Sequence, residues 1–71
     1  MNRYQLRKAR MIASVLLLAA AKSEAVSLSQ LGELAARMSE AQWITVSLQA
    51  GVSVADKPCR AAVVAILLNL A

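Results

Sequence analysis

Eleven consecutive residues, 11–21 (MIASVLLLAAA), contain one polar side chain, Ser14, in a chain of 71 residues. The run is too short to cross a membrane, because a spanning helix needs about 20 apolar residues. A helix that is apolar on all sides is surrounded by other elements. We therefore expect residues 4–22 to form the central helix of a bundle. On such a helix the large apolar side chains of this run together cover nearly the whole circumference. They are Met11, Ile12, Val15, Leu16, Leu17 and Leu18.

Apolar packing has to hold this small chain together. Cys59 is the single cysteine and cannot form an internal disulfide, and the chain has no histidine. Apolar residues, mostly Ala, Leu and Val, make up 59% of the chain, more than the roughly 45–50% of ordinary soluble domains. We predict a single all-α domain over residues 1–71, a compact bundle of about four short helices. Assembly into a homo-oligomer stays open, because the chain is close to the lower size limit for folding alone.

Two serines have the spacing of helix N-caps. Ser27 and Ser39 are each followed three residues later by a glutamine, Gln30 and Gln42, which is the capping-box pattern. They predict helices over residues 28–38 and 40–50, and Gly51 is placed to end the second of these.

A fourth helix is expected after Asp56, which would cap it, with Pro58 in its first turn. We expect the first helix to cover its apolar face. The residues expected on that face are Cys59, Val63, Ile66, Leu67 and Leu70, widened by Val64 and Leu68.

The sequence offers little for catalysis. It has no histidine, and its four acids are scattered at positions 24, 33, 40 and 56. We expect no catalytic residue, no metal site, no cofactor and no small-molecule substrate. Cys59 lies between Lys57 and Arg60, where a thiolate would be favoured, but its place on an apolar face favours a packing role.

The net charge of +4 comes entirely from the first ten residues. Arg3, Arg7 and Arg10 fall in one narrow sector of a helix. Arginine forks match acidic groups, and tyrosine and arginine are enriched at interface hot spots. We therefore predict that an acidic partner binds Arg3, Tyr4, Arg7, Lys8 and Arg10. Positive charges oppose the dipole at a helix N-terminus, so we expect residues 1–3, or slightly more, to form a disordered basic arm.

The start of the chain also has the outline of a secretory signal, a basic stretch followed by an apolar run and small residues. Cleavage near Ala21 or Ala25 would leave about fifty residues with one cysteine, a poor basis for a stable secreted domain. We therefore expect a cytoplasmic protein in which the run stays in the domain. A secreted or membrane-surface peptide is the alternative.

Residues 29–51 (SQLGELAARMSEAQWITVSLQAG) resemble the helix-turn-helix of small transcription regulators. The segment LGELAARM resembles the positioning helix, and Ser39 stands where the turn glycine usually sits. Glu40, where the family has an apolar residue, and Thr45, where it has Ile or Val, depart from the pattern. The resemblance implies DNA binding, with Gln42, Thr45 and Gln49 as the exposed stripe that contacts base edges.

By size and composition the chain is also similar to small phage-encoded inhibitors that bind host RNA polymerase. That similarity implies an acidic protein partner in the host cytoplasm. We therefore expect a non-enzymatic transcription regulator, and two partners stay open. The helix-turn-helix outline favours DNA, whereas the charge distribution favours a protein of the transcription machinery, because the third helix has no Lys or Arg.

Overall fold

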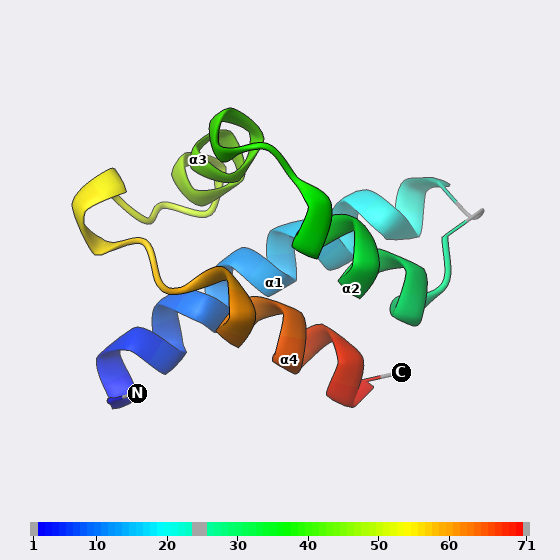
Figure 1. Cartoon of the computed structure of the whole chain (residues 1–71), viewed down its shortest axis with the longest axis horizontal. Helices are drawn as coiled ribbons and strands as arrows, with labels where there is room; N and C mark the ends of the chain where they lie inside the picture. The colour runs from blue at the N-terminus through cyan, green and yellow to red at the C-terminus, as the bar shows by residue number, and fades with distance from the viewer. Residues whose placement is uncertain (1, 24–25, 71) are drawn as a thin grey trace.

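The computed structural model describes residues 2–23 and 26–70. Within these residues the chain is all-α (Figure 1). The predicted bundle of about four helices is confirmed. The helices expected at 4–22, 28–38 and 40–50 are present, each end within one residue of its predicted place. The elements are α1 (Arg3–Ser23), α2 (Leu28–Arg37), α3 (Glu40–Gln49), the 3₁₀ helix η1 (Val54–Asp56) and α4 (Arg60–Leu70).

Local signals in the sequence fix the starts of α2 and α3 and the end of α3. The Ser27 hydroxyl accepts a hydrogen bond from the Gln30 N–H (3.2 Å), and the Gln30 side chain accepts one from the Ser27 N–H (2.9 Å). Ser39 and Gln42 form the same reciprocal pair, at 3.2 and 3.0 Å. Gly51 follows α3 with a φ of 80°, a conformation that glycine adopts without the cost of a Cβ. Both predicted capping boxes and the predicted end of α3 are confirmed.

An asparagine caps the basic helix. The Asn2 side-chain oxygen accepts a hydrogen bond from the Gln5 N–H at 2.8 Å, which satisfies one of the free donors of the first turn. Arg3 is therefore the first residue of α1. Met1 lies outside the described residues, and the disorder expected for residues 1–3 stays a prediction.

Helix α1 is the longest element, and α2, α3 and α4 all pack against it (Figure 1). Its buried side chains are Ala9, Ile12, Ala13 and Leu16. The other helices and the loop after α3 complete one hydrophobic core with Leu31, Ala35, Trp43, Val52, Ala62, Val63 and Leu67.

The other side of α1 faces solvent, so the expectation that helices surround it is wrong. Solvent reaches 36% of the surface of Met11 and 67% of the surface of Leu18. The reason is one of size: α2, α3 and α4 have 10, 10 and 11 residues, against 21 in α1. Because α2 and α4 also pack on each other, the three short helices cover only one side of α1.

The predicted start of α4 is corrected. Asp56 ends η1 and accepts a hydrogen bond from the Ser53 hydroxyl (2.9 Å), so it does not cap α4, which begins at Arg60. Cys59 precedes the helix and is exposed, and Leu70 is 53% exposed. Both residues therefore lie outside the predicted core.

Val63 and Leu67 are buried, as expected. Helix α4 contacts α1 and also α2. A Cβ at Gly32 would lie 2.8 Å from Leu68 Cδ2, so the missing side chain lets α2 and α4 approach closely.

Candidate interaction surface

The basic residues predicted to bind a partner lie on the first two turns and the start of the third turn of α1. Arg3, Arg7 and Arg10 are exposed, and their spacing places them on one side of the helix. Tyr4 is 51% exposed, and the Lys8 Nζ lies 4.9 Å from the centre of its ring. This cation–π contact holds an aromatic ring among the positive charges.

Four of these residues, together with Leu6, surround a hollow in the surface. Its lining consists of Arg3, Tyr4, Leu6, Arg7 and Arg10, and Leu6 is half-buried. The hollow thus combines an apolar leucine and a tyrosine ring with three guanidinium groups. A small anion could contact the guanidinium groups but not Leu6 or the Tyr4 ring. An acidic protein segment could contact the guanidinium groups through carboxylates and the apolar side chains through its own apolar residues. We call these five residues together with Lys8 the basic end of α1.

No carboxylate of the described residues pairs with the basic end. Within residues 2–23 and 26–70, the ion pairs join Glu40 to Lys57 and to Arg60. The guanidinium groups of Arg3, Arg7 and Arg10 make no ion pair in that part of the chain. They are therefore available to an acidic group on another molecule.

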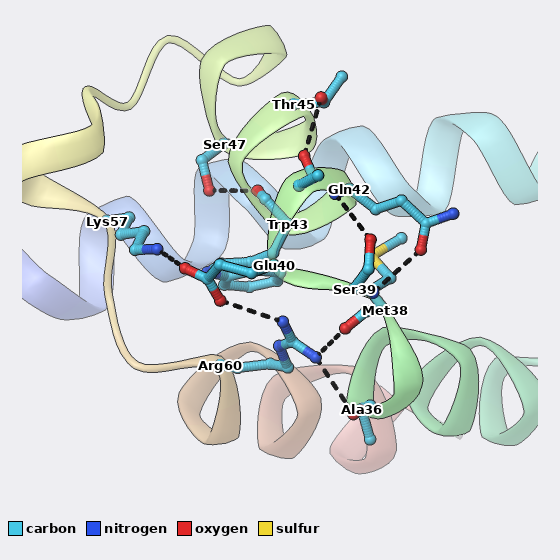
Figure 2. Close-up of polar contacts among 11 residues, drawn as sticks. Ala36, Met38, Ser39, Glu40, Gln42, Trp43, Thr45, Ser47, Lys57 and Arg60 are labelled. Atoms are coloured by element: carbon cyan, nitrogen blue, oxygen red, sulfur yellow. Dashed lines mark hydrogen bonds and ion pairs between the residues drawn. The ribbon is translucent and has the colours of Figure 1, made fainter.

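The residues predicted to read DNA bases lie on a different element. Gln42, Thr45 and Gln49 are all exposed on α3. The Gln42 side-chain oxygen is engaged with the Ser39 N–H, and the Thr45 hydroxyl donates to the Ala41 carbonyl (3.0 Å; Figure 2). In Figure 1, α3 lies apart from the N-terminal end of α1. The two predicted sets of binding residues are therefore not brought together.

A polar cluster that the sequence did not reveal joins three helices around Arg60 (Figure 2). Arg60 Nη1 donates hydrogen bonds to the carbonyls of Ala36 (3.3 Å) and Met38, at the C-terminal end of α2. Arg60 Nη2 lies 3.6 Å from Glu40 Oε2, in the first turn of α3. The guanidinium carbon lies 5.3 Å from the centre of the Trp43 ring. The Arg60 side chain thus provides hydrogen-bond donors for two carbonyl groups at the end of α2 and connects this end to α3.

Lys57 adds a second cation to this cluster through its ion pair with Glu40. The hydrogen bond from Lys57 lowers the pKa of Glu40, and the nearby charges of Lys57 and Arg60 lower it further. Glu40 is therefore held as a carboxylate at the N-terminus of α3. Lys57 and Arg60 serve the fold, because both are paired internally.

Residues that could support chemistry are dispersed in the part of the chain that the structure describes. No three His, Cys, Asp or Glu side chains gather there as a metal site would require. Cys59 is exposed beside Arg60. The packing role expected for its thiol is therefore wrong.

Nor does any helix among the described residues have the length and apolar character to cross a membrane.

Comparisons of the chain with protein-family models, curated proteins and solved structures return no match. Its function has to be argued from its own surface chemistry.

Proposed function

We propose that this chain is a non-enzymatic transcription regulator whose basic end docks on an acidic surface of a protein of the transcription machinery. The observation that carries the proposal is the arrangement of Arg3, Arg7 and Arg10. These three cations are exposed around one hollow and have no carboxylate partner among the described residues. The assignment to transcription rests on the resemblances noted for the sequence.

The chemistry of the basic end suits a protein partner. Guanidinium groups form bidentate, charge-assisted hydrogen bonds with carboxylates. Tyrosine and arginine are among the residues enriched at the hot spots that dominate interface energies. The opposite side of α1 is anchored in the core by Ala9, Ile12 and Ala13. Arg7 and Arg10 are therefore displayed on a formed helix, which reduces the ordering cost of binding.

DNA is the second candidate, because Gln42, Thr45 and Gln49 are exposed along α3. The charges on α3 favour DNA less than the charges on the basic end favour an acidic protein. Glu40 lies in the first turn of α3, and the helix contains no Lys or Arg. A negative charge there opposes a phosphate at the helix N-terminus, and phosphate contacts supply most non-specific affinity for DNA.

The test compares three immobilised proteins for retention of purified bacterial RNA polymerase. They are the wild type, the triple variant Arg3→Ala/Arg7→Ala/Arg10→Ala, and Arg37→Ala, which removes an exposed cation from α2. We expect the polymerase to be retained by the wild type and by Arg37→Ala but not by the triple variant. Equal retention by all three would show that the basic end is not the contact.

A parallel titration with mixed-sequence duplex DNA separates the two candidates. Contact with three or four phosphates would make the affinity fall steeply with salt, with a slope of about −0.9 per phosphate. We expect weak binding at low salt that the triple variant abolishes. Tight binding that depends on Gln42 and Gln49 would favour the DNA candidate instead.

A further inference from the structure

The solvent-facing side of α1 forms one continuous line that extends beyond the basic end. Its members recur at alternating intervals of three and four residues, and all of them are exposed. This spacing keeps side chains on one face of a helix, as in the seam of a coiled coil. We call this line the outer seam: Tyr4, Arg7, Met11, Ser14, Leu18 and Ala21.

The outer seam changes character along its length. Its first half contains Tyr4 and Arg7 and is flanked by Arg3 and Arg10, whereas the members of its second half are uncharged and the exposed Lys22 lies beside its end. Leu18, with 67% of its surface accessible, is the most exposed of the large apolar side chains that the structure describes. An apolar side chain as exposed as this one gains free energy when a partner covers it.

Ser14 lies between the two halves without interrupting the seam. Its hydroxyl donates a hydrogen bond to the carbonyl of Arg10 at 2.9 Å. The hydroxyl therefore keeps its hydrogen bond within α1 when a partner covers Ser14 and excludes water from it, so no buried donor is left without an acceptor. A small residue at this point leaves room for a neighbouring backbone to approach.

We propose that the outer seam is the docking surface for one amphipathic helix of a partner protein. Carboxylates of that helix pair with Arg3, Arg7 and Arg10, and its apolar residues cover Met11 and Leu18. The inference rests on the proposed function and extends it from the basic end to the apolar half of α1. The line from Tyr4 to Leu18 is about 21 Å long, at 1.5 Å per residue, which a partner helix of four turns matches.

Charge and geometry favour a protein helix over a lipid surface. A helix that lies on a membrane carries its cations on one face and its apolar residues on another. In the outer seam, Arg7 and Leu18 share one face and are separated along the axis. An acidic helix with an apolar end complements that arrangement.

A second copy of the chain fits less well. Two parallel α1 helices would bring their arginines together, and two antiparallel ones would place Arg7 against Leu18 of the other copy. Like charges or an unpaired charge at an interface disfavour such pairings.

The probe is a synthetic helical peptide of about four turns whose seam has glutamates at one end and leucines at the other. The control peptide has the same composition, with glutamate and leucine mixed along its seam. Binding of each labelled peptide to the full chain is followed by fluorescence anisotropy. We expect the first peptide to bind about tenfold tighter than the control, as burial of one leucine predicts.

Two matched substitutions locate the apolar contact. Leu18→Gln is expected to remove the tenfold advantage, whereas Leu48→Gln, at an exposed leucine on α3 (55% accessible), is expected to keep it. Both side chains are on the surface, so unchanged thermal melts will confirm that the variants fold.

The outcomes separate the inference from the proposed function. If Leu18→Gln binds both peptides as the wild type does while Arg7→Ala weakens both, the basic end stands as a binding site and the outer seam is overturned. If the triple variant Arg3→Ala/Arg7→Ala/Arg10→Ala also binds both peptides as the wild type does, the basic end is not a site for carboxylates and both proposals fail. Binding to anionic phospholipid vesicles that is lost in Leu18→Gln and is tighter than peptide binding would overturn the inference in favour of a membrane. A dimer of the free chain that dissociates in Leu18→Gln would overturn it in favour of self-association.

Discussion

The guanidinium group of Arg60, the first residue of α4, lies over the ring of Trp43 in α3, with 5.3 Å between its central carbon and the ring centre. Trp43 is buried, and the Arg60 side chain is 25% exposed. The same guanidinium donates to the carbonyls of Ala36 and Met38. Arg60 therefore holds the end of α2, the start of α3 and the first turn of α4 together.

Substitution of Arg60 by alanine is expected to destabilise the bundle by about 1–3 kcal/mol, because a cation–π contact and charged hydrogen bonds are lost together. Urea denaturation followed by the fluorescence of Trp43 measures the change. Arg37→Ala, at an exposed cation of α2, is the control and should stay within about 0.5 kcal/mol of the wild type. Equal midpoints for Arg60→Ala and Arg37→Ala would contradict the role given to Arg60.

The ion pair of Glu40 predicts a dependence of stability on pH. The Lys57 hydrogen bond lowers the pKa of Glu40 in the folded chain, so its contribution to stability is fully present above the unfolded pKa of about 4.3. That contribution is lost as the pH falls through the lower folded pKa. Denaturation midpoints of the wild type and Glu40→Gln should therefore differ at pH 7 and converge in acid. A constant difference down to pH 2 would show that the charge of Glu40 is not responsible.

Replacement of Gly51, which follows α3, by a residue with a side chain is expected to destabilise the fold. Its φ of 80° disfavours any residue with a Cβ. The nearest atom to an added Cβ is Met11 Cε at 3.8 Å, so the cost is conformational and not steric. Gly51→Ala is expected to lower the free energy of unfolding by about 1 kcal/mol. A more stable Gly51→Ala protein in chemical denaturation would refute this account of the turn.

The thiol of Cys59 is expected to react in the native protein, because the residue is exposed. A thiol reagent at neutral pH should modify it at a rate close to that measured in urea. Cys59→Ser should change the free energy of unfolding by less than about 0.5 kcal/mol. Protection of the thiol until the chain unfolds would restore the packing role expected from the sequence.

The parts of the fold that depend on neighbouring residues were predictable from the sequence. The starts of α2 and α3 follow from the Ser27 and Ser39 capping boxes, which act within four residues. The common side of Arg3, Arg7 and Arg10 follows from the helical repeat. These features need no knowledge of which helices pack together.

The parts that depend on tertiary packing were not predictable. Because apolar residues occur all around α1, the sequence did not indicate which side of the helix would be covered. The exposure of Leu18 follows from the short lengths of α2, α3 and α4, which cover only one side of α1. The Arg60 cluster joins residues 22 and 24 positions apart along the chain. The sequence near Asp56 and Pro58 has the pattern of a helix start, but Asp56 bonds back to Ser53 and the helix begins later.

The central claim is that the basic end of α1 is the binding surface for an acidic protein. The most direct measurement is the affinity of purified bacterial RNA polymerase for the wild type and for Arg3→Ala/Arg7→Ala/Arg10→Ala, at one fixed salt concentration. Loss of three interface arginines is expected to weaken binding by about a hundredfold or more, while Arg37→Ala leaves it unchanged. Equal affinities of the wild type and the triple variant would contradict the claim.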